Sequence, residues 1–164
     1  MQRFIDKLII FTVAIWLVTI SSVSAQTFGQ RMWSPEKPDS SEFAQEVLRL
    51  VNIERAKVGA RPLALLDELT ERANIRAEEI VQSFSHTRPN GSSCFTVLNG
   101  MSYHTVGENI AAGQASPEDV MDSWMNSQGH RENILNPNFK YFGLGYTYSE
   151  YSTYKNYWVQ LFMG

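Results

Sequence analysis

Cysteine is almost absent from the sequence: Cys94 is the only one among 164 residues. A single cysteine cannot form an intramolecular disulfide, which excludes a disulfide-stabilised scaffold. Its distance from the N-terminal region also excludes a lipid-attachment cysteine there. A lone cysteine is more often a small buried apolar residue than a reactive thiol. The fold must therefore be held together by its hydrophobic core, which a domain of this size can provide.

Basic residues are few and dispersed. The chain has 14 Lys and Arg residues against 17 Asp and Glu residues, which gives a formal net charge of −3. A protein that holds a nucleic-acid backbone needs a clustered basic surface, so the charge pattern excludes nucleic acid as a partner. The sequence also lacks internal repeats and low-complexity tracts, and its 43% hydrophobic content is typical of one globular domain.

A long hydrophobic run occurs once, over residues 8–20, and it follows Arg3 and Lys7. The small residues 23–25 then form a cleavage pattern, so residues 1–25 are predicted to be a secretory signal peptide. As a helix the run covers about 20 Å, less than the roughly 30 Å core of a bilayer. We therefore expect a secreted or periplasmic protein with no stable membrane span once the signal is cleaved. A retained N-terminal anchor is the alternative.

Residues 26–40 contain a glycine and two prolines without sustained periodicity, which predicts an extended lead-in. The domain itself is expected over residues 41–164. Cleavage of the signal removes Arg3, Asp6 and Lys7 and leaves a net charge of −4. The expected mature chain is therefore slightly more acidic than the full sequence.

Three helices are predicted from apolar residues at helical spacing. The first covers residues 41–58, and the second follows a short proline-containing link. The third begins at Pro117 after Ser116 as its N-cap, and Gly129 is expected to end it before a short helical turn over residues 130–135. The expected buried faces are, in chain order, Phe43, Val47, Leu50, Val51 and Val58; Leu69, Ala73, Ala77, Ile80 and Phe84; and Val120, Met121, Trp124 and Met125.

Two β-prone runs, over residues 141–148 and 154–163, predict a C-terminal hairpin. Both alternating faces of the second run are apolar, so this strand must be covered on both sides. The faces consist of Tyr157, Val159, Leu161 and Met163 on one side and Trp158 and Phe162 on the other. The expected fold class is therefore α+β, a three-layer α-β-α sandwich with a small antiparallel sheet between helices.

Few residues in the chain can carry chemistry. His86 follows the second predicted helix, and His130 follows the third. Glu108 lies among apolar residues and next to a glycine, and a carboxylate in such a setting is hydrogen-bonded or ligating. The remaining histidine, His104, is expected in a surface loop.

Four segments, residues 50–55, 84–89, 107–111 and 124–135, resemble the motifs of the CAP superfamily and follow the order of that family. The family comprises the cysteine-rich secretory proteins, antigen 5 and pathogenesis-related protein 1, and its domain is also called the SCP domain. The resemblance covers residues 42–164 and is strongest to the short, disulfide-free bacterial-type members. It implies the same α-β-α sandwich that the strand pattern predicts.

The resemblance also implies a central cleft, which many family members line with two histidines and two acidic residues. The matching residues are His86, Glu108 and His130, whereas the second acidic position is occupied by Ser127. These four residues form the predicted binding cleft. Ser127 makes the chain depart from a full four-ligand site.

His86, His130 and Glu108 together are the ligand set of an open divalent-metal site. Zn²⁺ or another divalent cation bound there would leave one position for water. In the alternative, both histidines cap helix ends and share Glu108 as a hydrogen-bond partner, so that the cleft holds together without metal. Both interpretations stay open on the sequence alone. Metal binding through histidine would weaken below about pH 6.

The expected function is that of a secreted binding module for an extracellular or cell-envelope ligand. The resemblance implies a lipid or sterol ligand, and a glycan or a peptide is also compatible with the sequence. Tyr148, Tyr151 and Tyr154, near the hairpin turn, offer a surface on which a sugar or a lipid could stack.

The alternative function is a metal-assisted hydrolase of peptides or envelope polymers, in which Glu108 is the catalytic base. A third function is that of a surface or toxin-like interaction protein whose cleft no longer acts. A serine hydrolase that uses Ser127 beside His130 is disfavoured, because the sequence has no nucleophile elbow and a serine near a helix end is usually a cap.

Overall fold

The structure is a computed structural model that describes residues 40–164. The predicted signal peptide and nearly all of the predicted lead-in lie outside the described residues. None of the described helices is long and apolar enough to span a membrane. The described elements are, in chain order, α1 (Ser40–Lys57), β1 (Ala64–Leu65), α2 (Asp67–Gln82), the 3-10 helix η1 (Cys94–Leu98), β2 (Val106–Ala112), α3 (Pro117–Met125), α4 (Gln128–Leu135), β3 (Tyr141–Tyr148) and β4 (Asn156–Met163).

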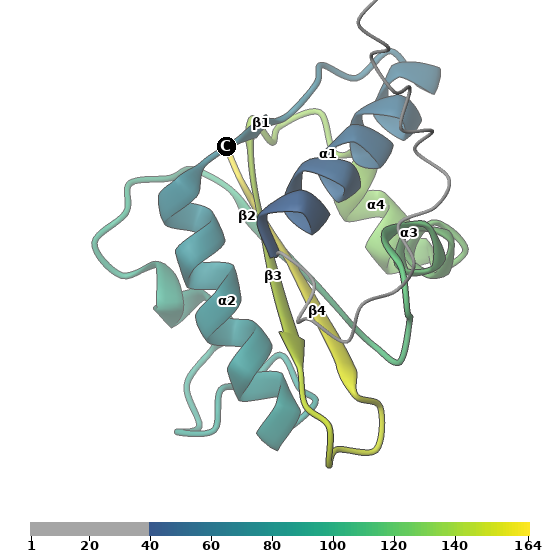
Figure 1. Cartoon of the computed structure of the whole chain (residues 1–164). Coiled ribbons are helices and arrows are strands. Elements are labelled where there is room, and N and C mark those ends of the chain that lie inside the picture. The colour runs from purple at the N-terminus through teal and green to yellow at the C-terminus, as the bar shows by residue number, and fades with distance from the viewer. Residues whose placement is uncertain (1–39) are drawn as a thin grey trace, which may run out of the picture. The chain divides into compact units, whose positions relative to one another are not determined.

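One four-stranded sheet organises the domain, with its strands in the order β1, β3, β4, β2 (Figure 1). β4 pairs antiparallel with both β2 and β3, whereas the two-residue β1 runs parallel to β3. The predicted α+β sandwich is confirmed, but its sheet is mixed rather than wholly antiparallel because of β1. A strand of two residues leaves too little pattern to be predicted. β2 lies at one edge of the sheet.

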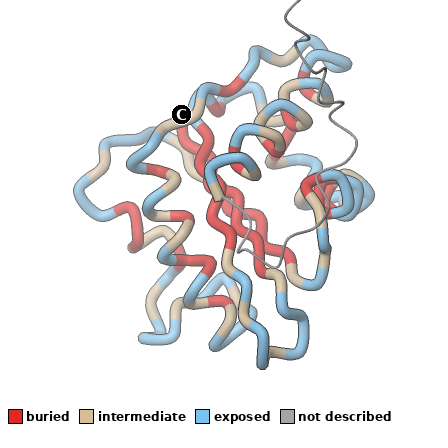
Figure 2. The backbone as a smooth tube through the Cα atoms, viewed as in Figure 1, coloured by how far each residue is buried: buried red, intermediate tan, exposed pale blue. Residues whose placement is uncertain are grey.

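Helices cover both faces of the sheet. α2 packs on one face, and α1, α3 and α4 pack on the other (Figure 1). The strands are buried between these layers, as the red central segments of Figure 2 show. On β4, Trp158 and Phe162 belong to the core cluster of α1, α3 and α4, whereas Val159 and Leu161 belong to the cluster of α2. The prediction that this strand is covered on both sides is therefore confirmed.

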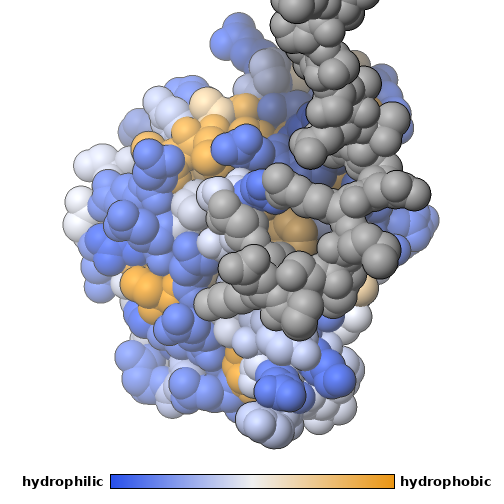
Figure 3. All heavy atoms as spheres, in the orientation of Figure 1, coloured by the Kyte–Doolittle hydropathy of each residue, from blue (hydrophilic) through white to orange (hydrophobic). Residues whose placement is uncertain are grey.

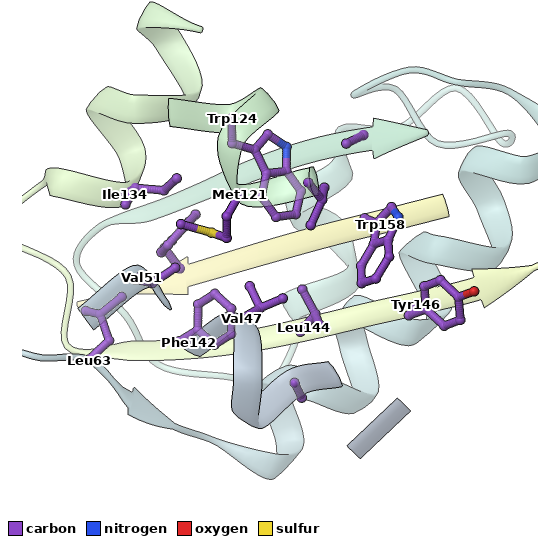
Figure 4. Packing of buried hydrophobic residues seen from close by; sticks show 14 of the residues in the cluster. Val47, Val51, Leu63, Met121, Trp124, Ile134, Phe142, Leu144, Tyr146 and Trp158 are labelled. Atoms are coloured by element: carbon purple, nitrogen blue, oxygen red, sulfur yellow. The ribbon is translucent and has the colours of Figure 1, made fainter. Parts of the chain in front are cut away.

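The larger core cluster lies between the sheet and the three helices of one layer. In Figure 4, Met121 and Trp124 approach the sheet from α3, and Val47 and Val51 approach it from α1. Ile134 adds a contact from α4 and is fully buried. Burial of each such side chain stabilises the fold by about 2 kcal/mol, so this layer needs no covalent cross-link.

The face of the molecule in Figure 3 is largely hydrophilic where the structure describes it, and its hydrophobic residues gather in a few separate patches. Scattered exposed apolar residues are ordinary on a soluble domain. The described part of this face therefore offers no extended apolar surface.

Two glycines of β3 allow α2 to lie against the sheet. A Cβ atom on Gly145 would come within 2.0 Å of the carbonyl oxygen of Ala73, and one on Gly143 would come within 2.4 Å of the carbonyl carbon of Leu69. Both clashes involve the α2 backbone, which cannot move aside as a flexible side chain could. The close approach of α2 to β3 thus depends on the absence of side chains at these two positions.

Several element boundaries differ from the prediction. Val58 and Phe84 are 58% and 50% exposed, so they lie outside the buried helix faces on which they were expected. Gly129 does not end the third helix: α3 already ends at Met125, and Gly129 is the second residue of α4. The chain changes direction at Ser127, whose extended backbone (φ −103°, ψ 122°) precedes the first turn of α4.

Other predicted boundaries are confirmed. The Ser116 hydroxyl oxygen accepts a hydrogen bond from the Asp119 N–H at 3.1 Å and so caps α3. β3 spans the predicted residues, whereas β4 begins at Asn156, two residues later than predicted. Lys155 adopts a left-handed backbone conformation (φ 62°) in the turn, which delays the return of the chain to the sheet.

Substitution of the two glycines Gly145 and Gly129 by alanine should have opposite effects. Gly145→Ala is expected to lower the free energy of unfolding by about 3 kcal/mol or more, because the new methyl group would overlap the α2 backbone. A Cβ atom on Gly129 would have no neighbour within 4 Å, so Gly129→Ala should leave the free energy of unfolding unchanged or raise it by up to about 1 kcal/mol. Urea denaturation of both variants tests this. Equal stabilities would contradict the close packing of α2 on β3.

Candidate functional site

The candidate site is built on β2, the edge strand. Side chains alternate along a strand, so Glu108 shares a face with Ile110, which packs with the α2 cluster, and Asn109 shares the other face with Ala111. Glu108 is 5% exposed and Asn109 is fully buried. Two polar side chains thus leave the same edge of the sheet towards different helices, and each needs hydrogen-bond partners there.

The partner of Glu108 on α2 is Arg76, whose side chain is fully buried. Arg76 Nε donates to Glu108 Oε2 at 2.8 Å, and Nη2 donates to Oε1 at 3.3 Å. Arg76 Nη1 also donates to Glu79 Oε2 at 2.6 Å, and Nη2 donates to the carbonyl oxygen of Ser85 at 2.8 Å. One guanidinium therefore connects α2, β2 and the residue that precedes His86.

His86 contacts the same carboxylate. Its Nδ1 lies 2.8 Å from Glu108 Oε1, and 57% of the His86 side chain is exposed. Burial alone would raise the pKa of Glu108, but the hydrogen bonds and positive charges of His86 and Arg76 hold that pKa below its usual value. An ionised carboxylate only accepts hydrogen bonds, so His86 Nδ1 carries the proton. In the neutral ring, Nε2 is then left with a free lone pair.

The loop that carries His86 is anchored on both sides. The Cys94 N–H donates to the carbonyl oxygen of His86 at 2.9 Å. Arg88 forms a fork with Glu79, in which Nε lies 2.9 Å and Nη2 lies 2.5 Å from Oε1, and its Nη1 donates to the Thr96 hydroxyl at 3.2 Å. These bonds tie the loop to α2 and to η1, so the position of His86 is fixed by charged and backbone contacts.

Cys94 lies beside the carboxylate. Its thiol is buried, and the ligand atoms of Cys94, His86 and Glu108 all lie within 4.8 Å of one another. Burial and the negative charge of Glu108 raise the pKa of the Cys94 thiol to about 11, so the thiol is protonated at neutral pH. The prediction of a buried cysteine is confirmed. Its place next to Glu108 had no signal in the sequence, because only the fold brings η1 to β2.

His130 lies inside α4, not at the end of the preceding helix as predicted. It is half-buried, and its Nδ1 is buried without a hydrogen-bond partner among residues 40–164. Burial lowers the pKa of His130, and a charge on the nearby His86 lowers it further, so the ring stays neutral near pH 7. In the described part of the chain Glu108 has hydrogen bonds from His86 and Arg76 but none from His130, so the two histidines do not share it.

A polar network on the other face of β2 holds α4. Asn109 Nδ2 donates to the carbonyl oxygen of His130 at 3.0 Å and to Gln160 Oε1 at 2.9 Å. Asn133 Nδ2 donates to Asn109 Oδ1 at 2.8 Å and to the carbonyl oxygen of Glu108 at 3.3 Å. The helix that carries His130 is therefore attached to the strand that carries Glu108 through side-chain amides.

Three residues of these networks were not predicted from the sequence, namely Arg76, Asn133 and Gln160. Two of them carried a usable signal, because Arg76 falls on the apolar stripe of α2 and Gln160 interrupts the apolar run of β4. A polar residue at an expected core position requires a buried partner. Asn133, on the short helix α4, had no comparable signal.

The two other residues of interest lie outside this network. Ser127 is half-buried at the N-cap of α4, three residues before His130, and its side chain makes no capping hydrogen bond. His104 is exposed, and its backbone N–H donates to the carbonyl oxygen of Gly164 at 2.8 Å. His104 therefore lies in a surface loop, as expected.

Because Glu108 is ionised in the folded state, the free energy of unfolding should depend on pH in the acidic range. Because its pKa is lower in the folded state than in the unfolded chain, its stabilising contribution is complete above the unfolded value of about 4.3 and is lost as the pH falls through the folded pKa. We expect the free energy of unfolding of Glu108→Gln to fall less between pH 6 and pH 3 than that of the wild type. Denaturant titrations across this range measure the difference.

Glu150→Gln is the matched control, because Glu150 is exposed on the hairpin and its removal should leave the acid dependence of the wild type unchanged. Some acid dependence should persist in Glu108→Gln, since the pKa of Glu79 is also held down by Arg88 and Arg76 against the effect of burial. Identical pH profiles of Glu108→Gln and the wild type would show that Glu108 is not preferentially ionised in the folded state.

Comparison with known proteins identifies similar domains. The model of the CAP, cysteine-rich secretory protein family matches residues 48–162. YkwD of Bacillus subtilis (strain 168), an uncharacterized protein, is 41% identical over 128 residues, which cover 76% of this chain and 48% of YkwD. The chain thus spans about half the length of this curated relative.

Solved structures of other proteins share the fold. An extracellular protein containing an SCP domain from Bacillus anthracis strain Ames gives a TM-score of 0.68 at 26% identity, over 80% of this chain and 45% of that chain. NaASP2, crystallised with Zn²⁺, gives a TM-score of 0.57 at 18% identity, over 79% of this chain and 83% of that chain. At 18% identity the likeness concerns the fold alone.

Proposed function

The chain belongs to the CAP family of cysteine-rich secretory proteins, and from this premise we propose that it is an exported ligand-binding domain that holds a divalent cation, such as Zn²⁺, at His86 and His130. The observation that carries the proposal is the 2.8 Å hydrogen bond between His86 Nδ1 and Glu108 Oε1. A carboxylate that fixes one ring nitrogen of a histidine and leaves the other free is the usual support of a metal-ligating imidazole.

The chemistry of the two imidazoles suits a divalent cation. His86 is exposed and has its Nε2 lone pair free, and His130 is kept neutral by burial. The unpartnered Nδ1 of His130 is a buried polar atom that the described residues leave unsatisfied. Two neutral imidazoles are ligands that Zn²⁺ prefers, and an open site with few protein ligands keeps positions for water or a ligand. A cation held there would supply a positive charge that attracts and orients an anionic or carbonyl group of a ligand.

In this proposal Glu108 orients His86 and does not ligate the cation itself. Both of its oxygens already accept hydrogen bonds from Arg76 or His86, and its side chain is 1% exposed. Arg76 also neutralises the carboxylate, which weakens its attraction for a second cation. The same burial disfavours Glu108 as the base of a hydrolase, because a general base must reach the proton that it removes.

Cys94 offers a different set of ligands together with His86 and Glu108. Binding through this set would displace the His86–Glu108 hydrogen bond and would require loss of a proton from a thiol whose pKa is raised to about 11. The pair His86 and His130 needs neither change. We therefore assign the cation to the two histidines, and substitution of Cys94 tests the assignment.

The domain also carries surface hollows away from the candidate site. Two surface hollows, of about 320 and 240 Å³, lie elsewhere on the domain. The larger is lined by Gly59, Ala60, Arg61, Pro62, Pro137, Phe139 and Lys140, and the smaller by Leu50, Glu54, Glu118, Met121, Asp122 and Met125. Neither is lined by the histidines of the candidate site. The lipid or sterol ligand that the family resemblance implies thus gains no support from these hollows.

Zinc titration tests the cation site. The purified wild-type protein is expected to bind one Zn²⁺ per chain, and His86→Ala and His130→Ala should each weaken binding at least 10-fold. Glu108→Gln should weaken it by about 10- to 100-fold, because the orienting carboxylate is lost. Calorimetric titration at neutral pH, with circular dichroism to verify folding, measures these affinities.

His104→Ala is the matched control, since this histidine lies outside the site and its removal should leave zinc affinity unchanged. Cys94→Ser should also be neutral. Equal zinc binding by the wild type and a His86→Ala/His130→Ala double variant would contradict the proposed site. Loss of binding in Cys94→Ser with full binding in His130→Ala would instead place the cation between His86, Cys94 and Glu108.

Export rests on residues 1–25 and is supported by the extracellular nature that is stated for the Bacillus anthracis relative. When the full chain is produced in a bacterial host, we expect a fraction outside the cytoplasm whose N-terminal residue is Gln26. Mass spectrometry of the intact chain checks this. A chain that keeps residues 1–25 at the membrane would contradict cleavage and would favour a retained anchor.

A further inference from the structure

Two exposed aromatic rings form one surface beside the candidate site. Phe84, just beyond α2, is 50% exposed, and Tyr154, in the hairpin between β3 and β4, is 53% exposed. Their ring centroids lie 6.5 Å apart with an interplanar angle of 43°. Residues far apart in the sequence therefore form a continuous aromatic surface, which we call the aromatic platform. Phe84 was predicted to lie on the buried face of the second helix, so its exposure needs a reason.

The Tyr154 ring of the platform is held in place by its neighbours. The ring of Tyr154 packs edge-on against the buried Tyr157, with centroids 6.3 Å apart at 82°. It also lies over Gly113 at the end of β2, where a Cβ atom would be 3.6 Å from the ring. The Gly113 N–H donates to the carbonyl oxygen of Asn156 at 2.9 Å, which fixes the hairpin to β2. A ring held in this way can bind a partner with little loss of conformational freedom.

The platform and the candidate site lie along the same edge of the fold. Phe84 precedes His86 by two residues, and the Tyr154 ring lies over Gly113, the residue that follows the strand carrying Glu108. From Glu108 to Ala112, beside Gly113, β2 extends about 13 Å at 3.3 Å per residue. Several units of a linear polymer can cover this distance, whereas a single small ligand cannot contact both ends.

The chemistry around the platform selects the kind of polymer. The hairpin carries one negative and one positive residue, Glu150 and Lys155, so it offers no net charge to a polyanion or a basic peptide. A membrane surface would require basic residues and large aliphatic side chains. Instead, the hairpin that carries Tyr154 also carries small hydroxyl side chains, namely Ser149, Ser152 and Thr153, of which Ser152 is hydrogen-bonded within the turn. Flat apolar rings with neighbouring hydroxyl groups match a sugar, whose ring faces carry C–H groups and whose rim carries hydroxyls.

We propose that Phe84 and Tyr154 form a stacking subsite for a neutral glycan chain that extends along the edge of the domain to His86. This inference deepens the proposed function by naming the class of ligand, and it rests on the premise that the domain is an exported binding module. It does not require the cation. Of the three tyrosines expected to offer a stacking surface, this assigns the role to Tyr154.

The test uses the purified protein and two uncharged hexasaccharides, chitohexaose and cellohexaose, in calorimetric titrations with EDTA present. We expect one of them to bind, and Phe84→Ala and Tyr154→Ala each to weaken that binding at least 10-fold. Because both side chains are about half exposed, the variants should keep the circular dichroism spectrum and thermal midpoint of the wild type. The monosaccharide of the same series should bind more weakly than the hexasaccharide, since a single sugar unit cannot contact both the platform and the surroundings of His86.

Tyr148→Ala is the matched control. Tyr148 is 41% exposed in the same hairpin, but it lies on the same face of β3 as Leu144 and Tyr146, which is the face that packs against the α1 layer. Its removal should change the affinity less than 2-fold. The proposal is overturned if neither hexasaccharide binds, if Tyr148→Ala weakens binding as much as Tyr154→Ala, or if the wild type binds phosphatidylglycerol vesicles through the platform instead of sugar.

The two proposals fail separately. Zinc binding by Phe84→Ala and Tyr154→Ala at wild-type affinity, without any sugar binding by the wild type, overturns the glycan subsite alone. Sugar binding in EDTA by a protein that takes up no zinc overturns the cation site alone and supports the subsite.

Discussion

The buried ion pair between Arg76 and Glu108 is the interaction on which the edge of this fold depends. The guanidinium reaches Glu108 with two of its nitrogens, and its other hydrogen bonds go to Glu79 and to the carbonyl oxygen of Ser85. Removal of one member of a buried pair leaves an uncompensated charge, which costs several kcal/mol. α2 therefore cannot slide along the sheet without breaking the pair. The same side chain consequently sets the register of α2 on β2 and the start of the loop that presents His86.

The sequence could predict those parts of the site that depend on local contacts, and not those that depend on long-range packing. Family motifs located His86, Glu108 and His130, and the apolar neighbours of Glu108 indicated that its carboxylate needs a partner. Arg76 was detectable as a charge on the apolar stripe of its helix, and two opposite charges at core positions require each other. Their pairing, however, follows only from the packing of α2 over β2. The position of Cys94 beside Glu108 depends on the same long-range packing, so no spacing in the sequence indicates it.

In the fold as well, features set by local sequence patterns were predictable and features set by long-range packing were not. Helical periodicity located α1, α2 and α3, and alternation located the hairpin, because each of these patterns is complete within one segment. Periodicity placed Val58 on the buried face of α1, but the buried position one turn after Val51 belongs to Arg55. Arg55 donates to the carbonyl oxygens of Ile134 and Asn136 at 2.7 and 2.9 Å, at the C-terminal end of α4 where the helix dipole is negative. Arg55 therefore gave the same signal as Arg76, a charge on an apolar stripe, but these two acceptors lie on a distant segment and no spacing in the sequence indicates them.

Because β2 lies at the edge of the sheet, two histidines from opposite layers contact adjacent residues of this strand. Glu108 faces the α2 layer and accepts from His86 Nδ1, whereas the next residue, Asn109, faces α4 and holds the carbonyl oxygen of His130. Adjacent residues of one strand thus fix the two histidines differently, one through its ring and the other through its backbone. The hydrogen bond to Glu108 fixes the orientation of the His86 ring. The His130 Nδ1 has no hydrogen-bond partner in the described part of the chain, so its ring is not held by such a bond at that nitrogen. A ligand at this edge would therefore find one imidazole already oriented and would supply the missing partner of the other.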